Sequence, residues 1–329
     1  MRVGIIGGGQ LGRMLALAGY DLGTTCTTLD PDAGSPAAAV APAIVGAYDD
    51  PDRLADLSDR VDVVTYEFEN VPVGAARLVE ERRPVFPPTA ALEAAQDRLA
   101  EKQLFERVGL PVPAWTAVDS LAALEGGLAR LGTPAVLKTR RLGYDGKGQA
   151  VIHDPVLAED AWRSVGEVAC TLESFVDFDR ELSIVAARGR DGDMAAFPLV
   201  ENHHREGILR LTRAPAPGLS SALQEAAEAH AHAVMAELGY VGVLAIELFQ
   251  VGERLLGNEM APRVHNSGHW TMEGAEVSQF EMHLRAVSGL PLGSTRPVGV
   301  SAMVNLIGEM PDAAAVLAVP GAHLHDYGK

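Results

Sequence analysis

The chain has few cysteines, few aromatic residues and no long apolar run. Only two of its 329 residues are cysteines, Cys26 and Cys170, and each lies inside an apolar stretch. This is no disulfide framework, so we expect two buried thiols. The first residues form too short an apolar run for a signal peptide, and no segment approaches the roughly 20 apolar residues of a membrane helix. We therefore expect a cytoplasmic protein.

Positive charge is also scarce. The 27 Lys and Arg residues are outnumbered by 44 Asp and Glu residues, so the formal net charge is −17. Such an acidic chain is a poor partner for nucleic acid or an anionic membrane, although a local basic pocket for phosphates remains compatible with it. With 47% hydrophobic and 22% charged residues, the composition is that of a globular protein. The length suits two or three domains.

The most unusual stretch is residues 258–269, which combines a carboxylate, a guanidinium and two imidazoles. An apolar stretch, residues 241–249, leads towards it and carries Glu247. We expect residues 252–254 to form a hairpin loop, whose centre places Glu247 opposite Glu259. Like charges opposed at about 5 Å are destabilising, so the pattern predicts a divalent cation that carries a nucleotide's phosphates. The alternative is an edge hairpin whose acids face water.

The first part of the chain has the pattern of a dinucleotide-binding fold. A buried strand, residues 2–6, leads into the glycine turn of residues 7–12, and Asp30 follows about 20 residues later. The same glycines also serve simply to let a helix pack close to its strand. Another strand ends at Glu67 and Glu69. Because ligands bind beyond the carboxyl ends of strands in open α/β sheets, these acids are a candidate substrate rim; a polar loop before a helix is the alternative.

A second glycine-rich stretch follows a strand that ends on Lys138. Residues 143–149 include three glycines and Lys147, and they lie between two expected strands. The backbone N–H groups of such a loop bind phosphate oxygens, so we expect a flap over phosphates; a plain glycine-rich hairpin is the alternative. Arg98 and Lys102 share a helix face, where they are either solvated or directed towards a phosphate.

The C-terminal part is expected to contain a helix at residues 273–288 and strands at residues 298–308 and 320–329. Before it, His203 and His204 are adjacent on an expected strand. Adjacent strand residues face opposite ways, so these histidines should not bind one metal together.

Four stretches now occur in order, at residues 7–14, 66–72, 143–149 and 258–269. Together they closely resemble the N5-carboxyaminoimidazole ribonucleotide synthetases, ATP-grasp enzymes of purine biosynthesis, and the likeness runs along the whole chain. The resemblance implies a fold that is part α/β and part α+β. Its parts would be a Rossmann-like pre-ATP-grasp domain (1–88), a two-lobed ATP-grasp core (89–290) and a small β-rich C-terminal domain (291–329).

The resemblance also implies an activity. Bicarbonate would be joined to the exocyclic amine of aminoimidazole ribonucleotide through carboxyphosphate, while ATP becomes ADP and phosphate and Mg²⁺ serves as cofactor. The partners would be these small molecules, with no nucleic acid and no membrane, and the family suggests a homodimer formed through the N-terminal domain.

Roles for individual residues follow from the same likeness. The expected Mg²⁺ ligands are Glu247 and Glu259, and the expected catalytic residues are Lys138, Arg263, His265 and Asn266. The expected ATP site comprises Arg98, Lys138, Gly143, Tyr144, Asp145, Gly146, Lys147, Gly148, Gln149, Glu173, Ser174, Phe175, Val176, Glu181, His204, Asn258 and Glu259. The expected site for bicarbonate and the ribonucleotide comprises Gln10, Leu11, Glu67, Glu69, Tyr144, Arg263, His265, Asn266, Ser267 and Lys329. Within the ATP site, Glu173 is expected to accept from the adenine amino group and Glu181 from the ribose.

One departure from the family pattern concerns the substrate phosphate. In the family a basic stretch continues past the position of Lys329 and helps to bind that phosphate, whereas this chain stops there. Lys329 would then be what remains of the phosphate site.

Other classes of protein remain open. A nicotinamide-dependent dehydrogenase is consistent with residues 7–12 and Asp30 but leaves the glycine loop and the Glu247/Glu259 pair unexplained. Another ATP-grasp carboxylate–amine ligase, such as the formate-using phosphoribosylglycinamide transformylase, would differ in its acceptor. A non-catalytic nucleotide-binding protein would not need both carboxylates and the Arg263–His265 turn.

Overall fold

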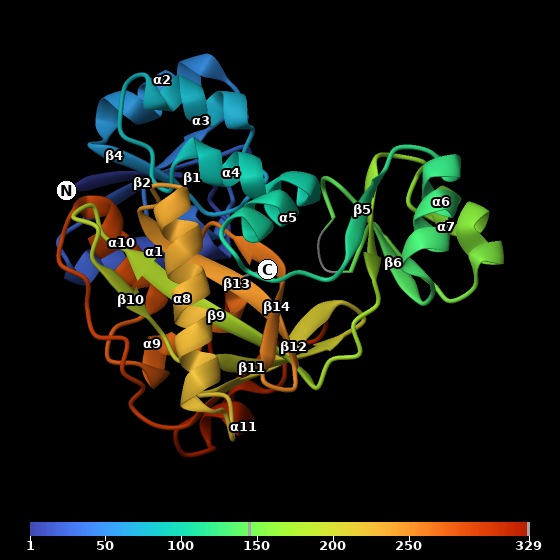
Figure 1. Ribbon diagram of the computed structural model, residues 1–329. Coiled ribbons are helices and arrows are strands. Elements are labelled where there is room, and N and C mark those ends of the chain that lie inside the picture. The colour runs from blue at the N-terminus through green and yellow to red at the C-terminus, as the bar shows by residue number, and fades with distance from the viewer. Residues whose placement is uncertain (144–145, 328–329) are drawn as a thin grey trace.

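The computed structural model describes residues 1–143 and 146–327, which form three sheets (Figure 1). The first sheet is parallel, with the order β3-β2-β1-β4. Its strands are β1 (Arg2–Ile6), β2 (Thr25–Asp30), β3 (Ala43–Val45) and β4 (Val63–Tyr66), and its helices are α1 (Gln10–Asp21), η1 (Pro36–Ala39), α2 (Pro51–Arg60) and α3 (Val73–Glu80). Apolar residues follow one another along β1 and are buried, as expected for a parallel strand covered on both faces.

The central sheet has seven strands in the order β14-β13-β9-β11-β12-β15, with β10 paired to β9. Its strands are β9 (Arg180–Arg188), β10 (Met194–Ala196), β11 (Val200–Arg205), β12 (Ile208–Ala214), β13 (Gly242–Val251), β14 (Arg254–Ala261) and β15 (Ser301–Val304). On β9 the side chains alternate. Leu182 and Ile184 are buried in a core with α8 (Ser221–Glu237), α4 (Thr89–Ala95) and α5 (Arg98–Arg107). Glu181 lines a cleft instead. Because neighbouring side chains of a strand point to opposite faces of the sheet, one face of β9 packs in the core and the other faces the cleft.

The first sheet and the central sheet share one hydrophobic cluster. Ile5 and Leu15 pack in it with Val243 and with Leu284 of α10 (Gln279–Ser288). His283 of the same helix lies within 2.8 Å of the Thr65 hydroxyl, through its Nε2, and accepts from the Val243 backbone N–H through Nδ1. These contacts anchor β4 to β13, so the carboxyl ends of the first sheet face the cleft of the central one.

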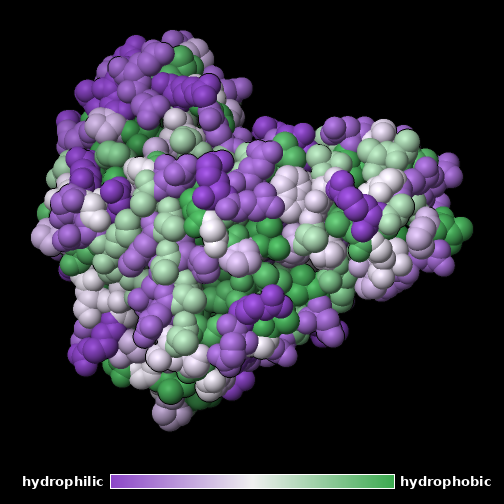
Figure 2. Space-filling view, viewed as in Figure 1, coloured by the Kyte–Doolittle hydropathy of each residue, from purple (hydrophilic) through white to green (hydrophobic). Residues whose placement is uncertain are grey.

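The third sheet forms a separate lobe at the right of Figure 1, with the antiparallel order β5-β8-β6-β7. Its elements are β5 (Trp115–Val118), α6 (Leu121–Leu131), β6 (Ala135–Thr139), β7 (Gln149–Ile152), η2 (Pro155–Leu157), α7 (Ala158–Ser164) and β8 (Cys170–Ser174). Figure 2 shows this lobe projecting from the body, with a notch between it and the N-terminal helices. The parallel first sheet and the two-lobed core confirm the expected fold class.

Three expectations near the C-terminus were wrong. The helix expected at 273–288 is two elements, α9 (Thr271–Gly274) and α10, because the Ser278 hydroxyl caps a new start by accepting from the Glu281 N–H. Only β15 forms within residues 298–308, where β12 supplies its partner. Residues 320–327 form no strand, since Gly321 turns the chain with a φ of +79°; the short helix α11 (Ala313–Leu317) precedes them.

Two smaller points complete the fold. Cys26 and Cys170 are free and buried, as expected. Within the described part of the chain, no helix has the length and apolar character needed to cross a bilayer.

Candidate active site

A cleft of about 1500 Å³ lies between the three sheets and collects most of the predicted residues. The predicted residues that line it are Gln10, Leu11, Glu67, Glu69, Arg98, Lys138, Gly143, Gly146, Lys147, Gln149, Glu173, Ser174, Phe175, Val176, Glu181, His204, Glu247, Asn258, Glu259, Arg263, His265 and Asn266. Ser267 is fully buried behind His265, and Gly148 lies against Thr139. Tyr144, Asp145 and Lys329 lie outside the described residues.

Two carboxylates face each other across neighbouring strands at the centre of the cleft. Glu247 of β13 is the register partner of Glu259 of β14. Burial and the charge of Glu259 raise the pKa of Glu247 to about 7. Burial acts on Glu259 in the same sense, but Arg98, which donates to it at 2.9 Å, and Lys138 hold its pKa below the ordinary value. Negative charge therefore exceeds positive charge around Glu247 in particular.

The predicted opposition is confirmed, but the predicted loop was wrong. The turn has two residues, Gly252 and Glu253, with Gly252 at a φ of +57°, and Arg254 already begins β14. A two-residue turn alone would place Glu247 opposite Asn258. The register shifts by one residue there, so that Leu248 pairs with Gly257 and Glu247 pairs with Glu259. A β-bulge at Asn258 therefore creates the acidic pair.

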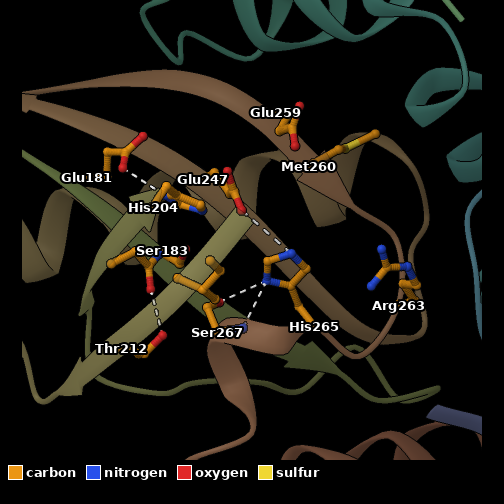
Figure 3. A network of polar contacts seen from close by, with 12 residues as sticks. Glu181, Ser183, His204, Thr212, Glu247, Glu259, Met260, Arg263, His265 and Ser267 are labelled. Atoms are coloured by element: carbon orange, nitrogen blue, oxygen red, sulfur yellow. Dashed lines mark hydrogen bonds and ion pairs between the residues drawn. The ribbon is translucent and has the colours of Figure 1, made fainter. Parts of the chain in front are cut away.

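His265 borders the acidic pair and is held as a neutral ring (Figure 3). Burial and Arg263 lower its pKa to about 4. Its Nδ1 accepts from the Ser267 backbone N–H at 3.3 Å and lies 2.9 Å from the Ser267 hydroxyl. The ring proton is therefore on Nε2, which lies 3.6 Å from a Glu247 oxygen. Ser267 thus orients His265 rather than lining the cleft.

Lys138 enters the cleft from the lobe. Its ammonium lies 3.1 Å from a Glu173 oxygen and donates to the Asn258 side-chain oxygen at 3.2 Å. The same Glu173 oxygen lies 3.2 Å from the buried Lys102 ammonium. Despite burial, Lys138, Lys102 and Arg98 lower the pKa of Glu173 to about 2. Glu173 lines the cleft and contacts both lysines, and its predicted role in adenine binding stays a prediction.

A separate part of the cleft carries aromatic rings that sequence reasoning missed. Phe178 and Phe249 stack with centroids 4.8 Å apart, and both line the cleft. Phe249 is the register partner of Glu181, whose carboxylate lies 2.7 Å from His204 Nδ1. That hydrogen bond and nearby acids raise the pKa of His204 despite its burial. The adjacent His203 contacts Glu201 instead of Glu181.

The two predicted acids of the N-terminal part have different surroundings. Glu69 forms an ion pair with Arg263, which joins the first sheet to the stretch after β14. Arg263 lowers the pKa of Glu69 although the carboxylate is buried. Glu67 instead accepts from the backbone N–H of Gly9 and, at 2.5 Å, from that of Gly12.

The position of Glu67 bears on the dehydrogenase alternative. In a dinucleotide-binding fold the pyrophosphate sits on the N-terminus of this helix. Here a carboxylate of the protein occupies those N–H donors, and Asp30 accepts from the Gly8 N–H at 2.7 Å and from the Tyr48 hydroxyl at 2.8 Å. Glycine is needed at position 7 because any Cβ there would lie 2.3 Å from the Cγ of Glu67 and would prevent this close packing.

Comparison with known proteins agrees with this geometry. The ATP-grasp domain model matches residues 103–280, the ribonucleotide synthetase preATP-grasp model matches residues 1–96, and the phosphoribosylaminoimidazole carboxylase C-terminal model matches residues 301–329. Fold and cleft therefore define an ATP-grasp protein.

Comparison with individual relatives identifies the family within the ATP-grasp class. An N5-carboxyaminoimidazole ribonucleotide synthase from Pseudomonas aeruginosa is 52% identical, over all of this chain and 91% of its own length. The synthetase structure from Thermus thermophilus is 59% identical, with a TM-score of 0.96 over 99% of this chain and 89% of its own. The Aspergillus clavatus synthase, solved with ADP and 5-aminoimidazole ribonucleotide, is 30% identical with a TM-score of 0.93, over 100% of this chain and 89% of its own. The chain belongs to the N5-carboxyaminoimidazole ribonucleotide synthase family.

Proposed function

We propose that this chain carboxylates 5-aminoimidazole ribonucleotide with bicarbonate at the expense of ATP, giving N5-carboxyaminoimidazole ribonucleotide, ADP and phosphate. The observation that carries the proposal is the pairing of Glu247 with Glu259 in a cleft that also receives Lys138, Arg98 and Arg263. Opposed acids among cations suit phosphoryl transfer, which needs charge neutralisation and positioning more than covalent help. The names of the relatives support the acceptor.

The acidic pair fits a magnesium ion that arrives with a nucleotide. Burial and the neighbouring charge of Glu259 raise the pKa of Glu247, and hard cations prefer carboxylate oxygens. Among the described residues no group of three or more His, Cys, Asp and Glu side chains is placed to hold a metal ion. Phosphate oxygens would therefore have to complete the coordination at Glu247 and Glu259, which is the usual arrangement for Mg²⁺. When bound, the ion neutralises charge on the phosphates.

Two bond exchanges make up the proposed reaction. A bicarbonate oxygen attacks the γ-phosphorus of ATP and the bond from that phosphorus to the ADP oxygen breaks, which yields carboxyphosphate. The substrate amine then bonds to the carboxyl carbon, of carboxyphosphate or of CO₂ released from it; the bond to phosphate breaks and the amine loses a proton. Closure of residues 143–149 over the cleft would keep water from carboxyphosphate.

The residues around bicarbonate divide the work. Arg263 has the planar donor pair that matches a carbonate, and Glu69 orients it. The neutral His265 presents its Nε2–H towards the acidic pair. The buried Asn266 side-chain oxygen has no hydrogen-bond partner in the described structure, so it is available to accept from the substrate amine.

We also propose which residues of the cleft contact the phosphates, the base and the ribose of the nucleotide. Lys138 and Arg98 reach the centre of the cleft, where the phosphates would lie, and the glycine loop would cover them. Ser174 ends β8, and Phe175 and Val176 follow it; all three line the cleft, as do the stacked Phe178 and Phe249. A base has a flat apolar surface there. Glu181, which contacts His204 and lines the cleft, would accept from the ribose hydroxyls.

Further features belong to the same proposal. We infer a cytoplasmic homodimer with small-molecule partners, divided at residues 88/89 and 290/291, in which Tyr144 and Lys329 contact the ribonucleotide and Asp145 belongs to the flap. Gln10 and Leu11 at the start of α1 face the same substrate. The family likeness supports each of these points.

The test is ADP release by the full chain with ATP and Mg²⁺, measured with and without bicarbonate and with and without 5-aminoimidazole ribonucleotide. Release that requires both supports the proposal. Release with bicarbonate alone would redirect the search to another acceptor, beginning with phosphoribosylglycinamide and formate. No release under any condition would overturn the proposed reaction.

A further inference from the structure

β14 is an edge strand, and its outer backbone groups need partners from outside the sheet. It pairs with β13 on one side only. Unpaired N–H and C=O groups at an edge are a liability, above all at a bulge, where the ladder is already interrupted. The bulge at Asn258 is the feature that places Glu259 opposite Glu247. Whatever holds this edge also holds the acidic pair.

The Pro111 carbonyl accepts from the Gly257 N–H at 2.7 Å, and α5 supplies the partners around Glu259. Glu101 of α5 accepts from the Met260 backbone N–H at 2.6 Å. Lys102 donates to the Asn258 carbonyl at 3.0 Å and to the Gly257 carbonyl at 3.5 Å. The two side chains therefore bind the backbone on both sides of Glu259. Arg98, three and four residues earlier on the same helix face, binds the Glu259 side chain itself.

Lys102 also reaches the phosphate end of the cleft. Its ammonium and that of Lys138 contact the same Glu173 oxygen, at 3.2 and 3.1 Å. Lys138 lines the cleft, whereas Lys102 is 0% exposed and does not line it. Lys102 thus stands behind both Lys138 and the bulge without facing a substrate.

The choice of lysine at this position is informative. Only four of the 27 basic residues are lysines, and arginine is used almost everywhere else. Three acceptors converge on one buried atom of Lys102. A compact ammonium satisfies them, whereas a planar guanidinium is larger and directs its donors in a fixed fork.

We propose that Lys102, together with Glu101, is a positioning residue for phosphoryl transfer: it fixes the bulge that presents Glu259 and the carboxylate that orients Lys138. The inference rests on the proposed ATP-dependent activity. It predicts that Lys102 governs the nucleotide and metal end of the cleft and leaves the ribonucleotide end unchanged.

The test compares Lys102→Met with Arg107→Met in the full-length chain. Arg107 is on the same helix but forms an exposed pair with Glu237, so it controls for changes in α5. We measure kcat, the KM of each substrate, and binding of ADP with Mg²⁺ by calorimetry, with circular dichroism as a check of folding. Lys102→Met should lower kcat and Mg²⁺–ADP affinity about 10- to 100-fold, as loss of an outer partner of a metal site does. The KM for the ribonucleotide should stay within about twofold, because that end of the cleft is untouched.

The test depends on whether kcat and Mg²⁺–ADP affinity fall while the KM for the ribonucleotide does not change. A folded Lys102→Met chain with unchanged kcat and unchanged Mg²⁺–ADP affinity would overturn the proposal, and so would a uniform loss in every parameter. If Lys102→Met does not fold, Lys102→Arg is judged by the same criteria, since it keeps the charge but not the geometry. ADP binding does not depend on the acceptor, so failure of this inference is distinguishable from failure of the proposed reaction.

Discussion

The glycine turn of residues 7–12 and the glycine loop of residues 143–149 differ in what lies against them. In the first, the carboxylate of Glu67 fills the N–H donors at the start of α1. In the second, Gly143 and Gly146 line the cleft that contains Lys138. A glycine-rich stretch offers backbone donors in both places, but the tertiary structure determines whether the protein or a ligand uses them.

The acids beside the two regions differ in the same way. Glu67 lies against backbone donors, so its charge is satisfied within the protein. Glu247 and Glu259 lie opposite each other, and burial together with the charge of Glu259 raises the pKa of Glu247 to about 7. The Glu67 carboxylate is therefore held by the protein's own backbone, whereas we propose that the Glu247/Glu259 pair is arranged for a cation. Four experiments test this difference.

The largest expected effect is on turnover. Glu259→Gln removes an anionic oxygen where the proposed cation binds and should lower kcat at least about 1000-fold. The fold should remain, because glutamine keeps the size of the side chain and an oxygen that accepts from Arg98. Steady-state kinetics and circular dichroism check this, with Glu253→Gln in the exposed turn of the same hairpin as control. An active Glu259→Gln chain would contradict the metal assignment.

Gly7→Ala should damage the first region through the fold. A Cβ there would lie 2.3 Å from Glu67 Cγ, at a φ of +111°. We expect the free energy of unfolding to fall by about 2–4 kcal/mol. Urea denaturation measures it. The control Gly23→Ala has a φ of +62° but nothing within 4 Å, so it should cost only about 1 kcal/mol. Equal losses in the two variants would refute the close packing of Glu67.

The acidic pair should make cation binding depend on pH. With a pKa of about 7, Glu247 takes up a proton as the pH falls below neutrality, so Mg²⁺–ADP affinity should weaken by up to about tenfold per pH unit. Without ligand, the stability of the fold depends on pH in the opposite direction. The raised pKa means that this group's contribution to stability is present below about pH 4.5 and is lost as the pH rises through 7. Calorimetry between pH 6 and 8 checks the affinity, and Glu247→Gln should lose the dependence.

The smallest effect concerns Glu67. Glu67→Gln keeps one acceptor oxygen but removes the charge at the start of α1, so stability should fall by about 1 kcal/mol. Thermal or urea unfolding measures this, with the exposed Glu81→Gln as control. A loss of activity without a loss of stability would instead place Glu67 among the groups that contact the ribonucleotide.

The local pattern was enough to predict several features. The buried strand at residues 2–6 and the glycine turn after it follow from the sequence pattern, and β1 and the start of α1 lie there. The opposition of Glu247 and Glu259 was also predicted, although for the wrong reason. The bulge depends on how β14 pairs with β13, how β13 pairs with β9 and how α5 contacts β14. The spacing of residues within one hairpin therefore does not predict it.

Other features depend on contacts that cross the chain. Lys102 was expected to be solvated or directed at a phosphate, yet it is buried beneath β14, 156 residues later in the chain. The contacts of Glu173 with Lys102 and Lys138 were not predicted either. Neither pairing has a sequence signal, because ion partners at long separation are selected by the packing of α5 between the lobe and the central sheet.

The sequence by itself determined which chemical groups are present, their order and their family, because periodicity, turn residues and four ordered stretches are local properties. Only the tertiary structure decided which carboxylates are satisfied and which remain opposed. That depends on which donors lie within about 3 Å of each oxygen, and such distances exist only once the three sheets have packed together.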